Sequence, residues 1–293
     1  MQIDLHTHST RSDGTVTPAA LVAEAVEKGL DVLALTDHDT AEGWPEAVRA
    51  AAELGITLVR GMEISATYDG RSVHLLAYLP DPTYPPLTQE LDRIRAGRDG
   101  RLPMMVERLQ AMGIDITEAD VRVAGAEGAV TGRPHVADAL VAKGVVADRD
   151  EAFATLLGPD GAAYVPRYAT SLLDAMDVVR GAGGVSVVAH PWGRGSSLTP
   201  EVITMLAGRG LTGIEADHQT HTPEQRARLR EIAADLGLVA TGSSDFHGTG
   251  KVDHELGCNT TDPAQYARLV VAATRARQES GRPAPEVLEI PAT

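Results

Sequence analysis

Histidines and carboxylates in this chain recur where short apolar, β-rich runs give way to loops, and this placement constrains the fold more than any other feature. His6 and His8 end the first such run, His38 follows the second, and His190 ends a later one. Imidazole and carboxylate groups together bind divalent transition metals. Ligands on separate strands can share a metal only where the fold gathers the strand ends. The pattern therefore predicts an α/β fold with a metal centre at one edge of its sheet.

The candidate ligands comprise six of the ten histidines together with three carboxylates. They are His6, His8, Asp13, His38, Glu63, His74, His190, Asp245 and His247. Because side chains alternate along an extended segment, His6 and His8 lie on one face and can bind the same ion. Nine ligands are too many for one ion, so we expect two or three clustered metals and a hydrolytic enzyme.

Strand and helix signals alternate in the first part of the chain and again in the last. Strands are expected at 3–5, 31–36, 56–60, 73–79, 184–190, 211–216 and 238–242, and helices at 17–29, 44–54, 171–179, 200–208 and 222–236. Thr17 followed by Pro18 is typical of a helix start, and Gly55 of a helix end. Such alternation with short connections predicts a mainly parallel sheet with its chemistry at the carboxyl ends of the strands.

The pattern changes at a proline-rich stretch just after residue 80. Between 87 and 168 the signals are mostly helical, at 87–112, 117–124, 133–143 and 149–157. We therefore expect a discontinuous metal-binding barrel formed by residues 1–80 and 171–275. An inserted helical subdomain at 87–168 is expected over the active site, and a loosely packed tail at 281–293.

Charge and cysteine content narrow the possible partners. The formal net charge is −15 and no Lys/Arg-rich run occurs, which argues against binding to duplex DNA. A small anionic substrate is still compatible, because clustered dications make a cleft locally positive. Cys258 is the only cysteine, and no apolar stretch reaches the roughly 18 residues that span a membrane. We expect a cytoplasmic protein without a membrane anchor.

The order of the motifs resembles that of the polymerase-and-histidinol-phosphatase (PHP) family. The motifs are His6-Thr-His8, Ser12-Asp13-Gly14, Thr36-Asp37-His38-Asp39, Gly61-x-Glu63, His74, Ala189-His190-Pro191 and Ser244-Asp245-x-His247. The resemblance covers about 1–80 and 171–260. It implies a distorted seven-stranded (β/α) barrel with a trinuclear metal site.

The resemblance also implies how the ligands are divided among three divalent ions. One ion would be held by His6, His8, Glu63 and Asp245, a second by Glu63, His74 and His190, and a third by Asp13, His38 and His247. Manganese is the first choice, while iron and zinc stay open because mixed histidine and carboxylate ligands suit all three. Glu63 and Asp245 are thereby candidate catalytic residues as well as ligands.

Other polar residues admit two interpretations each. Asp37 and Asp39 either orient metal-bound histidines or cap their turn. His218 is predicted to bind substrate or to act as the general acid, with a polar loop residue as the alternative. His221 and His254 are expected at the surface.

Basic residues outside the ligand set are candidates for binding substrate. Arg133 and His135 lie in a Gly-Arg-Pro-His stretch of the insertion, which either binds a second phosphate or simply begins a helix. Arg194 is close enough to His190 in sequence to reach an anion, although the glycines beside it also suggest a loop.

The Gly-Arg-Pro-His stretch resembles the branch of the family that contains 3′,5′-nucleoside bisphosphate phosphatases and 5′-3′ exoribonucleases. This resemblance implies a phosphoesterase in which a metal-bridging hydroxide attacks phosphorus. The expected substrates are nucleoside 3′,5′-bisphosphates, cleaved at the 3′-phosphate, and short 5′-phosphorylated RNA. A phosphatase of histidinol phosphate or another small metabolite is one alternative, and a non-catalytic, metal-stabilised accessory module is another.

Overall fold

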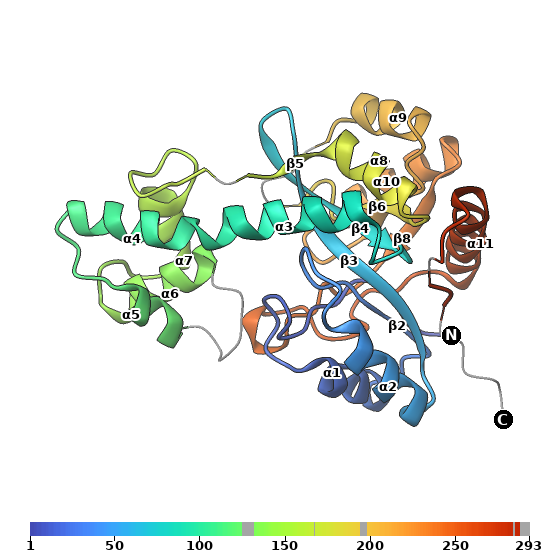
Figure 1. The fold of residues 1–293 in the computed structure, drawn as a ribbon, viewed down its shortest axis with the longest axis horizontal. Helices are drawn as coiled ribbons and strands as arrows, with labels where there is room; N and C mark the ends of the chain where they lie inside the picture. Colours follow the sequence, from blue (N-terminus) through green and yellow to red (C-terminus); the bar gives the residue numbers. More distant parts are fainter. Residues whose placement is uncertain (125–131, 167, 194–197, 284, 288–293) are drawn as a thin grey trace. The chain divides into compact units, whose positions relative to one another are not determined.

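The computed structural model describes residues 1–124, 132–166, 168–193, 198–283 and 285–287. Its contacts divide the chain into two compact units, which are taken in turn. The first unit comprises Met1–Leu91 and Thr170–Thr293, and the second comprises Asp92–Ala169 (Figure 1). The second unit is therefore an insertion in the sequence of the first.

A single sheet forms the centre of the first unit. Its strands follow the order β1 (Ile3–Asp4), β2 (Val32–Leu35), β3 (Thr57–Tyr68), β4 (Arg71–Tyr78), β6 (Val185–Val188), β7 (Gly213–Asp217) and β8 (Val239–Gly242), with β5 (Thr170–Ser171) paired to β3. A parallel bridge between Thr7 and Phe246 joins the chain beyond β1 to the chain beyond β8. The sheet is thus a nearly closed barrel of seven strands, which confirms the predicted fold class.

One strand departs from the parallel arrangement that the sequence led us to expect. Strand β4 is antiparallel to both of its neighbours, β3 and β6. The cause is the two-residue turn Asp69-Gly70, in which both residues have positive φ, at 48° and 72°. An Asp-Gly pair between β-rich runs is a strong signal for a tight hairpin, and a hairpin reverses the chain. As a result, Glu63 lies within β3 and His74 within β4 rather than beyond strand ends.

Helices connect the strands, and their ends follow the predicted capping signals. They are α1 (Pro18–Glu27), α2 (Trp44–Leu54), α8 (Leu172–Gly181), α9 (Pro200–Gly208), α10 (Pro223–Asp235) and α11 (Pro263–Ser280). The Thr17 side chain accepts a hydrogen bond from the Ala20 amide, and Gly55 ends α2 at φ 74°. Helix α11 was not among the predicted helices, although Asp262 and Pro263 give it the same kind of start.

Mostly aliphatic side chains fill the core of the barrel, together with the large ring of Tyr78. Ile3, Val32, Val187 and Val239 belong to this cluster, and none of them is more than 3% exposed. Tyr78 is fully buried among them, and its hydroxyl donates a hydrogen bond to the Leu5 carbonyl at 2.9 Å. The hydroxyl therefore ties β4 to the segment that carries the first two histidines.

Helix α11 and the residues after it also pack on this core. Tyr266, Leu269 and Ala273 of α11 are buried in the cluster, and Val287 is packed against it. The Arg60 guanidinium donates to the Glu286 carbonyl at 2.7 Å. The part of the tail that is described thus makes specific contacts with the barrel.

The second unit is helical and has a core of its own. After α3 (Pro85–Asp99) it contains α4 (Arg101–Ala111), α5 (Glu118–Ala124), α6 (Arg133–Ala142), α7 (Arg149–Ala152) and a π-helical turn at Phe153–Leu157. The single helix predicted at 87–112 is two helices that meet at Gly100, and Pro103 falls in the first turn of α4, where proline is tolerated. Leu109, Val121, Val136 and Leu140 are fully buried in this unit. Among the described residues, no helix is long and apolar enough to cross a membrane.

Replacing Tyr78 by Phe should destabilise the barrel without leaving a large cavity. The change removes a buried hydrogen bond to Leu5 but keeps the ring, so the free energy of unfolding should fall by about 1–2 kcal/mol. Urea unfolding of the metal-stripped protein measures this difference. A change below about 0.3 kcal/mol would mean that this hydrogen bond contributes nothing net to stability.

Candidate metal centre

The first and last motifs meet because backbone hydrogen bonds close the barrel beside them. The His8 amide donates to the Phe246 carbonyl, and the Asp245 amide donates to the His6 carbonyl, both at 2.9 Å. Consequently His6 and His8, which follow β1, lie beside Asp245, which follows β8. The β3–β4 hairpin brings Glu63 and its neighbours to the same place.

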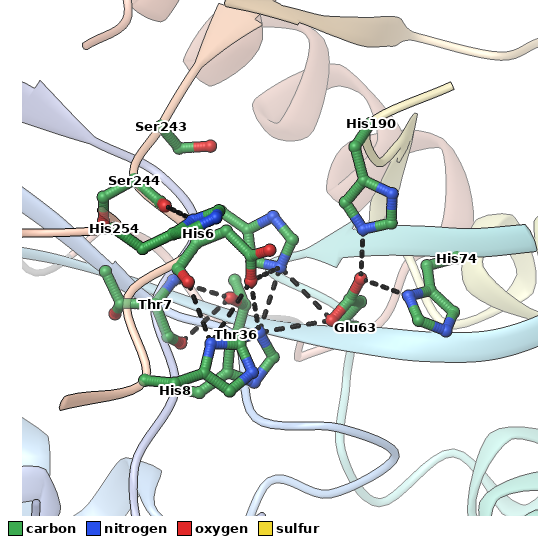
Figure 2. A network of polar contacts seen from close by, with 12 residues as sticks. His6, Thr7, His8, Thr36, Glu63, His74, His190, Ser243, Ser244 and His254 are labelled. Carbon is green, nitrogen blue, oxygen red and sulfur yellow. Dashed lines mark hydrogen bonds and ion pairs between the residues drawn. The ribbon is translucent and has the colours of Figure 1, made fainter. Parts of the chain in front are cut away.

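Glu63 is the centre of the cluster. Its side chain is 1% exposed and lies between two groups of histidines, with His74 and His190 on one side in Figure 2. Five imidazole nitrogens surround it: those of His6, His8 and His38 lie 3.2 Å from Oε2, and those of His74 and His190 lie 2.8 and 3.2 Å from Oε1. Both oxygens of one carboxylate thus face several potential ligands.

The spacing of these atoms fits a shared cation. The Nε2 atoms of His6 and His8 are 3.0 Å apart, and both are 3.2 Å from the same oxygen of Glu63. Ligand atoms about 2.1 Å from one tetrahedral ion lie about 3.4 Å from each other. Two imidazole nitrogens aimed at one point, beside a carboxylate, are therefore arranged as metal ligands are.

Further candidate ligand atoms lie close to these. Asp245 Oδ1 is 3.6 Å from His6 Nε2 and 3.4 Å from His8 Nε2. Asp13 lies 3.6 Å from His38 Nε2 and 3.3 Å from His247 Nε2. The structure adds His8 to this last set and His38 to the set around Glu63 and His74. All nine candidate ligands are thus brought together, while their division among ions stays a prediction.

The pKa values of the carboxyl groups in the cluster are lowered, so these groups carry the negative charge that binds cations. Burial alone would raise the pKa of Glu63, but the surrounding imidazoles of His38, His74 and His6 lower it well below its ordinary value. Asp13 and Asp245 are shifted in the same direction, with burial again opposed by neighbouring cationic groups. The carboxylates are therefore ionised over the whole neutral range.

The pKa values of the histidines shift in opposite directions. Burial opposes charge on His8, but hydrogen bonds to Asp245 and Glu63 outweigh it and raise its pKa to about 9. Burial dominates at His38 and lowers its pKa to about 3. In the absence of metal, His8 therefore holds a proton at pH 7, and a metal must displace it.

Residues outside the predicted set also take part in the cluster. Glu215 is fully buried and contacts His6, and its sequence position in β7 gave no sign of this. The Lys251 ammonium forms an ion pair with Asp245 Oδ2. A single lysine in a polar loop carries no motif, so only the fold could show it.

The prediction that His221 and His254 are surface residues was wrong. Both are buried, at 3% and 8% exposed. His221 Nδ1 donates to the Ala216 carbonyl at 3.0 Å, and His254 Nδ1 donates to the Ser244 carbonyl at 2.7 Å. The loops after β7 and β8 turn inward, and these backbone carbonyls satisfy the imidazoles. Polar neighbours in the sequence concealed this.

His218 lies at the edge of the cluster, as its position after β7 suggested. It is 1% exposed, with Nε2 3.2 Å from Asp245 Oδ2 and Nδ1 2.8 Å from the Thr220 hydroxyl. Burial lowers its pKa. It is therefore a neutral imidazole near pH 7, held beside the candidate ligand Asp245.

Asp37 and Asp39 both accept hydrogen bonds from backbone amides of segments that are distant in the sequence. Asp37 accepts from the Ser9 amide and Asp39 from the Ser65 amide, each at 2.7 Å. Asp37 also accepts from the Ser12 hydroxyl, whose oxygen is 3.4 Å from His8 Nδ1. Asp37 therefore supports a candidate ligand through one intervening side chain.

The predicted substrate residues of the insertion belong to the second unit. Arg133 begins α6, stacks over the rings of Phe153 and Tyr164, and donates to the Leu157 carbonyl at 3.3 Å. His135 Nδ1 accepts from the Gly132 amide at 3.0 Å, so it caps the helix. Arg194 lies outside the described residues.

Comparisons with known proteins identify the family. A model of the PHP domain matches residues 4–115. The chain is 36% identical to a 5′-3′ exoribonuclease of Haemophilus influenzae over 83% of this chain and 89% of that protein. It is 34% identical to a 3′,5′-nucleoside bisphosphate phosphatase of Chromobacterium violaceum over 94% and 97%, respectively. The chain belongs to the PHP family.

A solved structure supports the same conclusion. A Bifidobacterium adolescentis protein described as a metal-dependent phosphoesterase is 40% identical, with a TM-score of 0.84, over 92% of this chain and 96% of its own. The predicted enzyme class, a metal-dependent phosphoesterase of the PHP family, is thereby confirmed. The His, Asp and Glu clusters are able to hold its metal.

Replacing Glu63 by Gln should abolish tight metal binding at the PHP cluster. Glutamine offers a neutral amide in place of the two anionic oxygens that would bind the ions together with the five imidazoles. Metal affinity should therefore fall by at least about a hundredfold. Metal content after equilibration with micromolar Mn²⁺ measures this. His135→Gln, in the second unit, is the matched control and should keep the full content. A folded Glu63→Gln protein that also keeps it would refute the central role of Glu63.

Without metal, the protein should lose stability as the pH rises from 7 to above 9. His6 and His8 have raised pKa values in the folded protein, so the folded state holds protons that the unfolded state releases near pH 6.5. Their contribution is complete below about 6.5 and lost as the pH passes the folded values. Thermal unfolding measures this. Manganese-loaded protein should lack the decline, because its ligand histidines carry no such proton. If thermal stability fell with pH in the same way with and without metal, His6 and His8 would not be the groups that a metal deprotonates.

Proposed function

We propose that this protein hydrolyses phosphate esters of nucleotides with three divalent ions, manganese being the best candidate. The preferred reaction is removal of the 3′-phosphate from nucleoside 3′,5′-bisphosphates, with 5′-3′ cleavage of short 5′-phosphorylated RNA as a second activity. The observation that carries this proposal is the buried carboxylate of Glu63, whose two oxygens face five imidazoles. The names of the two relatives support the nucleotide substrate.

Bound divalent ions would supply an activated water as the nucleophile and neutralise charge on the phosphoryl oxygens. The protein's own contribution is to hold the ligands rigidly. Glu63 would serve two ions at once, since its oxygens face different histidines. Asp245 would use Oδ1 for the ion beside His6 and His8, because that oxygen faces their Nε2 atoms.

The other oxygen of Asp245 positions two groups that can act on substrate. His218 Nε2 lies 3.2 Å from Oδ2, and the Lys251 ammonium pairs with the same atom. Lys251 is 37% exposed, so its charge can reach a phosphoryl oxygen. The neutral His218 would bind the leaving oxygen through a hydrogen bond. Asp245 thus joins the candidate ligand set to groups that bind substrate.

A bisphosphate needs a second anion site, and we assign it to the insertion. Arg133 presents a planar donor that suits phosphate, and its stacking on Phe153 and Tyr164 limits its freedom. His135, two residues further along the chain, would contribute to the same site.

Metal-stripped protein restored with Mn²⁺ should release phosphate from adenosine 3′,5′-bisphosphate in preference to AMP and histidinol phosphate. AMP should be the product. Preference for histidinol phosphate would move the protein to the small-metabolite alternative. No turnover on these three or on 5′-phosphorylated RNA, with metals bound, would contradict the proposed function.

Replacing Arg133 by Met should raise KM for the bisphosphate by about tenfold or more and leave KM for a monophosphate nearly unchanged. The reason is that only the bisphosphate offers a second phosphate to the guanidinium, and a charge-assisted hydrogen bond contributes about 1.5–3 kcal/mol. Steady-state kinetics on both substrates measures the ratio. Arg149→Met is the matched control, since that arginine is already paired with Asp138. Equal effects on both substrates would dismiss the second-phosphate role.

A further inference from the structure

Glu215 is a fully buried carboxylate beside the metal centre, and it is not one of the nine candidate ligands. It lies in β7 and is 0% exposed. Its Oε1 lies 3.1 Å from His6 Nδ1 and accepts from the Ser243 hydroxyl, and its Oε2 accepts from the His190 amide at 2.7 Å. One side chain therefore contacts the segments that follow β1, β6 and β8.

The contact with His6 decides which nitrogen of that ring can bind a metal. A carboxylate accepts a hydrogen bond, so Nδ1 must carry the proton. In the neutral form of the ring that binds a metal, the nitrogen without a proton is then Nε2, which lies 3.2 Å from Glu63 Oε2. A histidine whose second nitrogen donates to a carboxylate is fixed in tautomer and orientation and is a more basic ligand.

The contact with His190 acts on the backbone instead of the ring. His190 has φ 28°, which is unusual for a residue with a side chain, and such a conformation persists only where neighbouring groups impose it. The hydrogen bond from its amide to Glu215 is one such restraint. This backbone conformation directs the ring towards Glu63, where Nε2 lies 3.2 Å from Oε1.

We propose that Glu215 is a positioning residue that links the two ion sites sharing Glu63, without ligating either ion. It sets the tautomer of His6 on one side of Glu63 and the backbone of His190 on the other. The inference rests on the metal dependence in the proposed function but not on the identity of the substrate. Among the described residues, Glu215 contacts His6, Ser243 and the His190 amide but not Asp13 or His247, so the third ion should be independent of it.

The test is Glu215→Gln, which keeps the shape of the side chain. Gln has one acceptor oxygen where Glu has two, so its NH₂ group must face either His6 Nδ1 or the His190 amide. Facing His6, it would favour the tautomer that protonates Nε2. Facing His190, the NH₂ group would place one hydrogen-bond donor against another, the His190 amide. Either arrangement harms one ligand, and because Glu63 is shared, both ions of the pair are affected.

Stepwise calorimetric titration of metal-stripped protein with Mn²⁺ gives the readout, independently of any substrate. We expect the affinity of two ions to fall about 10- to 100-fold while the third is retained within about threefold. Glu46→Gln, on the surface beside Arg11, is the matched control and should titrate like the wild type. Ser243→Ala, which removes one contact of Glu215 but leaves His6 and His190, should also keep the affinity of the pair.

Two results would overturn the proposal. Unchanged affinity for all ions in a folded Glu215→Gln protein would show that the contacts do not position the ligands. An equal loss at all three sites, together with a large loss of stability in the metal-stripped protein, would show that Glu215 only supports the fold. Failure of the proposed function would look different, because it would leave this titration intact and remove only nucleotide turnover.

Discussion

A carboxylate that is buried with its charge must be surrounded by groups that stabilise it, and Glu63 meets this constraint with five imidazoles from four separate segments. Burial of an ion costs several kcal/mol unless partners compensate for it. Protonated histidines compensate partly, but they repel one another at these distances. Divalent cations resolve both problems, because they are attracted to the carboxylate and bind the imidazoles in neutral form. The need to neutralise Glu63 therefore explains why so many ligands converge there.

Two features of the barrel, its closure and its antiparallel strand β4, bring these side chains together. Closure by the bonds between His8 and Phe246 and between His6 and Asp245 places residues more than two hundred positions apart in one cluster. The antiparallel β4 strand brings His74 to Glu63 within a hairpin. Left-handed backbone conformations occur at Asp39, His190 and Asp245, which are in or beside the cluster. Such strained positions gather at functional sites, where surrounding contacts hold them in place.

Residue type and spacing were enough to single out the histidines and carboxylates that the fold brings together around Glu63. Alternation of His6 and His8, and histidines after apolar runs, need no tertiary information. Strand β4 departs from the expected parallel arrangement because the Asp69-Gly70 pair forms a tight hairpin turn, which alternation of strand and helix signals does not reveal. Glu215 and Lys251 could not be singled out, since a carboxylate within a strand and a lysine in a polar loop are ordinary in a sequence. Only the fold brings Glu215 to His6 and Lys251 to Asp245. His254 was misjudged for the same reason.

The central claim is that Glu63 is shared by metal ions that its flanking histidines complete. Anomalous diffraction at the manganese edge, from crystals grown with Mn²⁺, tests it most directly. The account predicts strong peaks on both sides of the Glu63 carboxylate, one beside His6 and His8 and the other beside His74 and His190, with a further peak near Asp13. Peaks elsewhere, or a single peak with no contact to Glu63, would contradict it.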